Sequence, residues 1–132
     1  MAKLSPDQVA FLENPFVGVV TTLRPDGSPH STVVWVDVLE DGTPSFNTAR
    51  KRAKDVNLER DPRLSLVVID PKNAYRWLGV DGRARLTEEN ADEQIDKLAK
   101  KYLDADSYPN RTEEEVRVSV RIDVDRIEAR GL

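Results

Sequence analysis

Four cationic side chains lie within five residues of an otherwise acidic chain. They are Arg50, Lys51, Arg52 and Lys54. Residues 50–63 contain six Arg or Lys and three Asp or Glu, a local charge of +3 in a chain of formal charge −4. If a helix begins at Thr48 or Ala49, the cations fall in its first turn, where the helix dipole disfavours positive charge. Free backbone N–H groups and cations at such a position suit a phosphate, although a solvated charged face has the same pattern.

Polar side chains flank this basic segment. Asn47 and Thr48 precede it, as expected either of helix caps or of hydrogen-bond donors to a phosphate or ribityl group. Lys54 and Asn57 stand at i and i+3, so they share one helix face. The segment from residue 47 to 57 is therefore the strongest candidate for an anion-binding site.

The remaining residue types exclude several kinds of catalytic and metal site. The 132 residues include no Cys and only one His, His30. Disulfides, cysteine nucleophiles, iron–sulfur clusters and Cys-ligated or His-rich metal sites are therefore excluded. No Ser-His-Asp arrangement, glycine-rich phosphate loop or GxSxG turn occurs. The sequence predicts no metal site, and redox chemistry would require a bound organic cofactor.

Length favours one domain over residues 1–132, and we expect the protein to be cytoplasmic. The first residues lack the apolar run of a signal peptide, and no stretch approaches the ~20 apolar residues of a membrane span. The net charge of −4 argues against general nucleic-acid binding, which normally requires positive charge. Nucleic-acid binding through the local segment 50–54 remains one alternative.

The elements that must position these side chains are six or so antiparallel strands and two or three short helices. Helices are expected at about 5–14, 49–60 and 90–103, the first and last with capping boxes at Ser5 and Asn90. Strands are expected at about 16–23, 30–39, 44–48, 64–70, 74–86 and 116–124, with a bulge near Asp81-Gly82. So few helices favour a small β-barrel over alternating βαβ units. Since side chains fill such a barrel, a ligand would lie outside it or at a subunit boundary.

Four strings in this sequence carry a family resemblance. They are Asp-Gly-Ser-Pro-His at 26–30, Val-Val-Trp-Val at 33–36, Arg-Ala-Lys-Asp-Val-Asn-Leu-Glu-Arg-Asp-Pro-Arg at 52–63 and Gly-Arg-Ala at 82–84. Over nearly its whole length the chain resembles the pyridoxamine 5′-phosphate oxidase-like split β-barrel superfamily. Within it, the chain is most similar to small flavin/deazaflavin oxidoreductases that use coenzyme F420. The most specific string is Arg-x-Lys-x-x-Asn-Leu followed by Asp-Pro-Arg.

This resemblance implies a mainly β FMN-binding split barrel that forms a homodimer, with the cofactor in a groove between the subunits. It also implies which side chains hold the phosphate of the cofactor. Arg52 and Lys54 would grip the phosphate, and Asn57 would support them. Lys51, together with Arg50, would suit the longer anionic tail of F420.

The same resemblance implies contacts to the rest of the cofactor. Val33, Val34 and Trp35 would line the isoalloxazine-like ring, and Trp77 would contribute from the partner subunit. The residues implied for the ribityl chain or phosphate are Asn47 and Thr48. The family's chemistry is hydride transfer from the reduced ring, so the protein mainly orients the reactants.

The leading functional prediction is an F420H2-dependent reductase of a small conjugated or heteroaromatic substrate. The alternatives are an FMN-dependent oxidoreductase of the same fold and a cofactor-binding protein with little turnover. Oxidation of vitamin B6 is not expected, because the C-terminal residues 126–132 lack the Arg-Leu-x-Pro ending of pyridoxamine phosphate oxidases.

Overall fold

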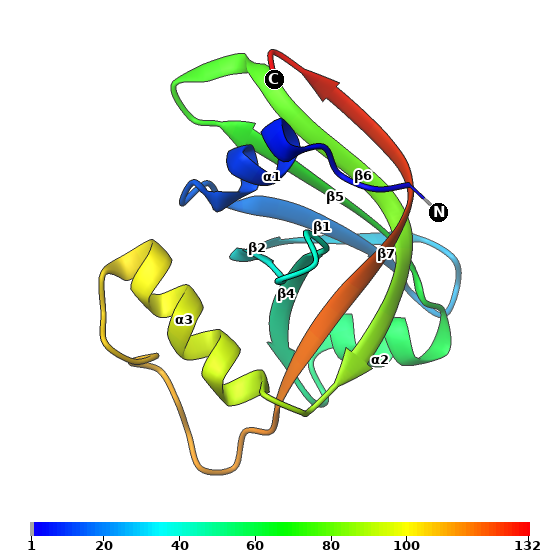
Figure 1. The fold of residues 1–132 in the computed structure, drawn as a ribbon. Coiled ribbons are helices and arrows are strands. Elements are labelled where there is room, and N and C mark those ends of the chain that lie inside the picture. The colour runs from blue at the N-terminus through cyan, green and yellow to red at the C-terminus, as the bar shows by residue number, and fades with distance from the viewer. Residues whose placement is uncertain (1) are drawn as a thin grey trace.

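The computed structural model describes residues 2–132, so residue 1 of the expected domain lies outside the described residues. Within them, seven strands form one antiparallel sheet with three helices around it (Figure 1). The strands are β1 (Gly18–Leu23), β2 (Pro29–Val34), β3 (Val36–Val38), β4 (Pro44–Ala49), β5 (Arg63–Asp70), β6 (Asn73–Thr87) and β7 (Arg117–Arg130). The helices are α1 (Pro6–Glu13), α2 (Ala53–Arg60) and α3 (Ala91–Leu103). The prediction of a mainly β split barrel is confirmed.

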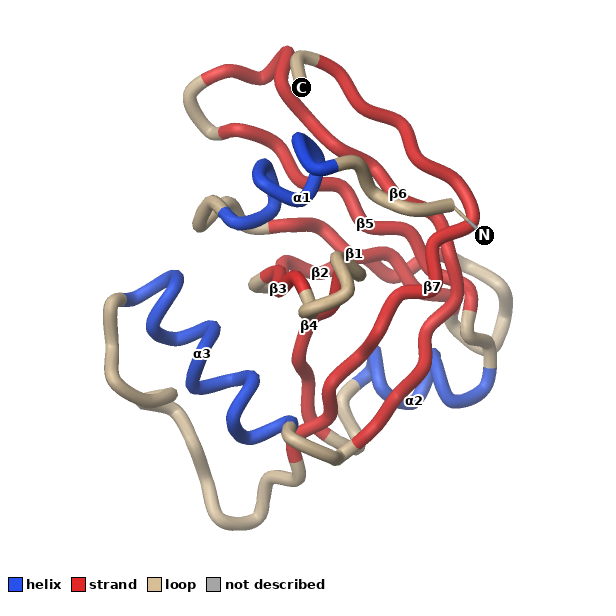
Figure 2. Tube along the Cα trace, in the orientation of Figure 1, coloured by secondary structure: helices blue, strands red, loops and turns tan. Residues whose placement is uncertain are grey.

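The two edge strands of the sheet follow one another directly in the chain. The strand order is β2-β1-β5-β6-β7-β4-β3, and only Trp35 separates β2 from β3. In a flat sheet the edge strands would lie about 29 Å apart, whereas two successive Cα–Cα steps span only about 7 Å. The sheet therefore curls until its edges meet at Trp35. Figure 2 shows the curled sheet. The single strand predicted over 30–39 is wrong for this reason, because the chain changes edge at Trp35.

Apolar side chains fill the concave side of this curled sheet. Val20, Leu66 and Val80 lie opposite one another on three neighbouring strands, and each is at most 3% exposed. Burial of one such side chain contributes roughly 1.5–3 kcal/mol to folding. Because the interior is packed, a ligand cavity can form only at the split or on the outside.

The long strands β6 and β7 bend together at a glycine. Their register shifts between Asp81 and Gly82, which confirms the predicted bulge. A Cβ atom on Gly82 would lie 2.3 Å from the backbone oxygen of Asp123, so this close approach requires glycine. Strand β7 continues to Arg130, beyond the predicted end at residue 124, because it pairs with β6 as far as Trp77.

The two predicted capping boxes have different outcomes. At α1 the Gln8 backbone N–H donates to the Ser5 hydroxyl, and the Ser5 backbone N–H donates to the Gln8 side chain, which confirms the first. The second is wrong, because Asn90 has a left-handed backbone with φ of 58° and its side chain makes no capping hydrogen bond. No helix within residues 2–132 has the length and apolar character needed to span a membrane.

Candidate functional site

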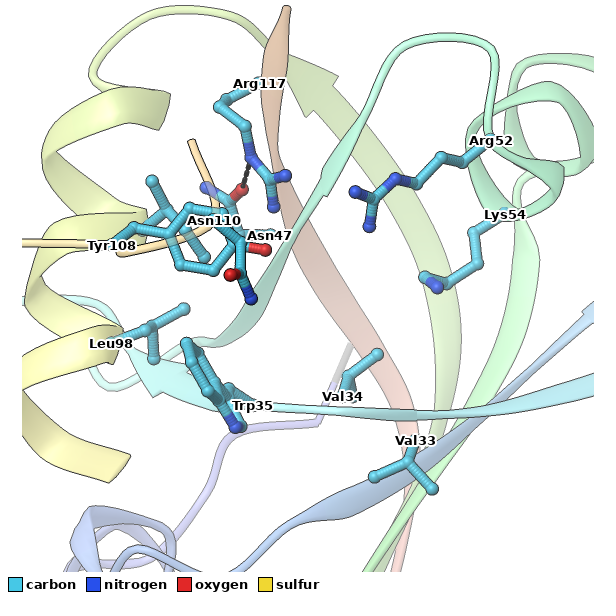
Figure 3. A pocket seen from close by; sticks show the side chains of 11 residues that line it. Val33, Val34, Trp35, Asn47, Arg52, Lys54, Leu98, Tyr108, Asn110 and Arg117 are labelled. Atoms are coloured by element: carbon cyan, nitrogen blue, oxygen red, sulfur yellow. Dashed lines mark hydrogen bonds between the residues drawn. The ribbon is translucent and has the colours of Figure 1, made fainter. Parts of the chain in front are cut away.

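A cavity of about 220 Å³ opens beside Trp35, where the edges of the sheet meet (Figure 3). Strand β2, strand β4 and the start of α2 supply part of its lining, and α3 and the loop that follows α3 supply the rest. Six of the ten side chains predicted for the site line this cavity. They are Val33, Val34, Trp35, Asn47, Arg52 and Lys54. The curl of the sheet thus brings the two strings at 33–36 and 52–63 to one place.

The other four predicted side chains do not line this cavity. Thr48 is fully buried in β4, and Lys51 is exposed. Asn57 is buried in α2, where its Nδ2 atom donates to the Thr22 hydroxyl at 3.0 Å. Trp77 lies on β6 beside a separate hollow. Contacts of these four side chains with a cofactor remain predictions.

Three of the four cations, Arg50, Lys51 and Arg52, precede α2, and only Lys54 lies in its first turn. Strand β4 continues through Ala49 by pairing with β7, so α2 begins only at Ala53. The predicted start at residue 48 or 49 is therefore wrong. Lys51 has a φ of 76°, which reverses the chain, and its backbone N–H donates to Asp55 Oδ2 at 2.9 Å. Arg52 then occupies the N-cap position of α2.

Arg50 pairs with acidic side chains of the same protein. Its guanidinium contacts Asp55 at 2.9 Å, Glu59 at 2.7 Å and Glu88 at 3.0 Å. Hydrogen bonds to Glu88, Glu59 and Asp55 raise the pKa of Arg50 despite some burial. Because three carboxylates surround it, Arg50 joins the loop to α2 and to the turn between β6 and α3, and it does not line the cavity.

Arg117 supplies a third cation, which the sequence analysis missed. Its Nε atom donates to Asn47 Oδ1 at 2.8 Å, its NH1 group pairs with Glu115, and its guanidinium lies 5.2 Å from the centre of the Tyr108 ring. Arg117 is only 5% exposed. In the alternating pattern of 116–124 it occupies a polar position, which predicts solvent exposure. One sequence signal points instead to burial of Arg117. The segment of α3 is amphipathic, so its apolar face must pack against some surface of the sheet.

A single carboxylate joins two of the three cations. Glu115 contacts Arg52 at 2.9 Å through Oε2 and Arg117 through Oε1. Burial raises the pKa of Glu115, but the hydrogen bonds and charges of Arg117 and Arg52 outweigh burial and hold that pKa below its usual value. Glu115 is therefore ionised at neutral pH.

Lys54 has no such partner. Among residues 2–132 it forms no ion pair, although it is only partly exposed. Burial lowers the pKa of Lys54, and the positive charges of Arg52 and Arg117 lower it further. An anion in the cavity would offset this repulsion, so the charges of the three cations suit a negatively charged group.

The opposite wall of the cavity is aromatic. The Trp35 ring stacks on Tyr102 with 5.4 Å between centres and 6° between planes, and it meets Tyr108 edge-on at 6.1 Å. The Tyr102 hydroxyl donates to the Phe16 oxygen at 2.6 Å and accepts from the Val36 N–H at 3.0 Å. These contacts fix the orientation of Trp35, so the cavity has a rigid, planar apolar surface.

Asn47 is held by neighbours on three sides. Its Nδ2 atom donates to the Ala91 oxygen at 2.8 Å and to Gln94 Oε1 at 2.9 Å, while its Oδ1 accepts from Arg117. Both N–H bonds of the amide are thus used within the protein. Asn47 orients Arg117 and has only an oxygen lone pair left for a ligand.

The structure offers no metal centre among the residues that it describes. Within residues 2–132 no group of three or more His, Asp or Glu side chains could hold a metal ion. The chemistry of the lining, which is cationic on one side and aromatic on the other, fits a phosphate joined to a flat ring.

The curled sheet and its open split define a split β-barrel, and comparison with known proteins identifies its family. The family model described as pyridoxamine 5′-phosphate oxidase matches residues 4–131. The chain belongs to this family, which confirms the resemblance noted in the sequence.

Relatives within this fold include a curated protein and two solved structures. The chain is 36% identical, over 92 residues, to a Mycobacterium tuberculosis (strain CDC 1551 / Oshkosh) protein named F420H(2)-dependent biliverdin reductase. The match covers 66% of this chain and 62% of that relative. A structure named F420 reductase has a TM-score of 0.80 at 28% identity, with 95% of this chain and 98% of the other covered. The conserved hypothetical protein Rv2991 from Mycobacterium tuberculosis has a TM-score of 0.76 at 28% identity, with 98% and 86% covered.

Proposed function

We propose that the protein is an F420H2-dependent reductase that transfers a hydride to a small conjugated or heteroaromatic substrate. The observation that carries this proposal is the convergence of Arg52, Lys54 and Arg117 opposite the wall formed by Val33, Val34 and Trp35 (Figure 3). A phosphate and a flat ring are the two chemical groups that such a cavity would bind. A ribityl phosphate joined to a deazaflavin ring has both.

Each group of side chains has a role in this proposal. Arg52, Lys54 and Arg117 bind the phosphate through charge-assisted hydrogen bonds. Trp35 and the valines before it hold the ring and exclude water from one of its faces. Asn47 keeps Arg117 in position through the 2.8 Å hydrogen bond to its Nε atom.

The bound deazaflavin would supply the hydride, so the protein needs mainly to orient the two reactants. Among the described residues that line the cavity, none is Asp, Glu or His. Apart from the arginines, the ionisable side chains that line the cavity are those of Lys54 and Tyr108. This composition suits a reaction in which binding and orientation dominate.

The names of two relatives support F420 as the cofactor. One is the biliverdin reductase, of which the match spans 62%, and the other is the F420 reductase structure. Biliverdin is an extended conjugated molecule, which is consistent with the proposed class of substrate. The FMN-dependent alternative draws support from the family description and from the three cations, because FMN ends in a doubly charged phosphate.

We further propose that two copies of the chain pair through the outer face of the sheet. Val33, Val19 and Val67 lie opposite one another on β2, β1 and β5, and they are 64%, 44% and 38% exposed. Ile69, which is 48% exposed, pairs with Trp77 on the neighbouring strand. Such a continuous apolar strip is typical of an interaction surface.

The position of Val33 links this apolar strip to the cavity. Val33 lines the cavity and also belongs to the exposed strip. A second copy that covers the strip would therefore close the open side of the cavity. This arrangement supports a homodimer in which each site is completed by the partner.

The test is a parallel titration of the apo protein with F420 and FMN, followed by tryptophan and cofactor fluorescence. Tighter binding of F420, with oxidation of F420H2 upon addition of biliverdin or another conjugated acceptor, would support the proposal. Preference for FMN would favour the flavin enzyme. Tight binding of F420 without substrate-dependent oxidation would favour a cofactor-binding protein, and binding of neither cofactor would contradict all three.

A further inference from the structure

The carboxylate of Glu115 lies between two cavity arginines but does not itself line the cavity. Its two oxygens contact Arg52 and Arg117, one each. Both arginines line the cavity, and Glu115 is not among the residues that do. The carboxylate contacts only the NH2 group of Arg52 and the NH1 group of Arg117, so other N–H bonds of both guanidinium groups remain available to a ligand.

Glu115 sets the charge of this site. Arg52, Lys54 and Arg117 carry three positive charges, and Glu115 cancels one of them, so a net charge of +2 faces the ligand. The Glu115 side chain is only 14% exposed, so solvent screens it weakly. The strength with which the cavity attracts an anion therefore depends on this one side chain.

We propose that Glu115 is a specificity-determining residue that favours a singly charged phosphodiester over a doubly charged phosphomonoester. The phosphate of F420 is a diester with one negative charge, and the other charges of F420 lie on its tail, whereas the phosphate of FMN is a monoester. This inference rests on the proposed function and concerns the phosphate subsite, where the two cofactors differ. Glu115 repels a ligand in proportion to the charge of that ligand. It therefore penalises a dianion twice as much, in free energy, as a monoanion.

Glu115 stays mostly ionised over the range in which a phosphomonoester titrates. Its pKa lies below the usual value because Arg117 and Arg52 outweigh the effect of burial. The second pKa of a phosphomonoester is about 6. FMN is thus mostly a monoanion at pH 5 and mostly a dianion at pH 8, while Glu115 stays ionised.

This difference allows one ligand to test the proposal. Dissociation constants for FMN are measured at pH 5 and pH 8 with the wild-type protein and with Glu115→Gln. Riboflavin, which has the ring and ribityl chain but no phosphate, is the uncharged control, and F420 is the phosphodiester. Comparison of variant with wild type at one pH removes the effect of every other titrating group that the two proteins share.

Two further variants separate charge from shape. Glu114→Gln removes a neighbouring negative charge that is exposed and forms no ion pair among residues 2–132, so it should leave every affinity unchanged. Glu115→Asp keeps the charge but shortens the side chain. It should keep the wild-type ratio between the affinities for dianion and monoanion.

The expected result is a gain in affinity that grows with ligand charge. Glu115→Gln should bind FMN about tenfold more tightly at pH 8 but only about threefold more tightly at pH 5, since the Coulomb energy scales with the product of the charges. Affinity for riboflavin should not change, which would also show that the variant has a native cavity.

Other outcomes would overturn the inference. An equal loss of affinity for all phosphate ligands would mean that Glu115 only positions the two arginines. Unchanged affinities would mean that its charge does not reach the ligand, and a loss of riboflavin binding would mean that it maintains the shape of the cavity. If neither wild type nor variant binds F420 or FMN, the proposed function fails as well, whereas tight binding with an unchanged charge ratio overturns the inference alone.

Discussion

Arg117 and Asn47 are joined by a 2.8 Å hydrogen bond between two side chains that are at most 9% exposed. The residues lie on β7 and β4, which pair directly in the sheet. Asn47 also donates to Gln94 and to the Ala91 oxygen on α3. One amide therefore links the helix that covers the site to the arginine that would bind the ligand.

This hydrogen bond predicts that Asn47→Ala lowers the stability of the protein. It should also lower the affinity for the cofactor, because Asn47 keeps Arg117 in position. The substitution leaves the buried Arg117 Nε–H and the Gln94 carbonyl without partners, which should cost about 1–3 kcal/mol in the free energy of unfolding. Urea denaturation measures this loss. Asn110→Ala is the matched control, because Asn110 lines the same cavity but is exposed. Equal stabilities for the two variants would contradict the structural role of Asn47.

Among residues 2–132, Lys54 has no ion-pair partner that its loss would leave unpaired, so we predict that it is the cation whose removal weakens phosphate binding without destabilising the protein. Lys54→Ala should weaken cofactor binding about 10- to 100-fold, as expected for a charge-assisted hydrogen bond worth roughly 1.5–3 kcal/mol. Stability of the apo protein should not fall, because burial and two neighbouring arginines already disfavour the Lys54 charge. Lys51→Ala is the control, since Lys51 is exposed and does not line the cavity. A similar loss of affinity in both variants would disprove this specific role.

The two tryptophans should report ligand binding differently. Trp35 lines the cavity and stacks on Tyr102, whereas Trp77 lies on β6 beside a different hollow. In Trp77→Phe, which retains Trp35, the fluorescence should therefore still change when the cofactor binds. In Trp35→Phe most of this change should disappear, and any remaining signal would indicate a contribution of Trp77 from a partner subunit. A full signal in Trp35→Phe would contradict the assigned cavity.

Local sequence signals predicted those elements that depend on neighbouring residues. The capping box at Ser5 needs only residues 5–8, and the alternation of 116–124 identifies β7 from its own side chains. Both were confirmed. The bulge at Gly82 was also predictable, because a glycine within a strand pattern signals close backbone approach.

Features that depend on distant parts of the chain could not be predicted in this way. The start of α2 was predicted too early because pairing with β7 holds Ala49 in β4, and a local pattern does not contain that pairing. Arg117 was missed because an alternating strand does not indicate which face another element covers. The pairing of Glu115 with Arg52 joins residues 63 positions apart, so only the folded chain reveals it.

The apolar strip on the outer face of the sheet predicts the effect of a charge at its centre. Val67→Glu should convert a dimer to a monomer, since burial of an unpaired carboxylate in an interface is strongly unfavourable. Analytical ultracentrifugation of both proteins at micromolar concentration measures the change. Val56→Glu is the control, because Val56 is 51% exposed but lies on α2 and not on the sheet. A wild-type protein that is already monomeric would contradict the proposed homodimer.

Two adjacent side chains of α3 predict how stability depends on pH. The Lys101 Nζ atom donates to the Leu12 and Val36 oxygens at 2.6 Å, yet burial outweighs the nearby charges and lowers the pKa of Lys101 to about 8. Burial also raises the pKa of Tyr102 to about 12. The corresponding pKa values in the unfolded chain are about 10.4 and about 10. The folded protein therefore holds the Lys101 proton more weakly than the unfolded chain does, and it holds the Tyr102 proton more tightly.

The sign of each effect follows from which state holds the proton. Between pH 8 and about 10.4 the unfolded chain keeps the Lys101 proton that the folded protein loses, so the free energy of unfolding should rise with pH. Between about pH 10 and pH 12 the folded protein keeps the Tyr102 proton, so the same free energy should fall. Each change should be roughly 2 kcal/mol after a discount for partial exposure. Urea denaturation from pH 7 to 11.5 should find that the free energy of unfolding is greatest near pH 10. The rise below that pH should be smaller in Lys101→Met, and the fall above it should be smaller in Tyr102→Phe. Identical profiles in all three proteins would refute both assignments.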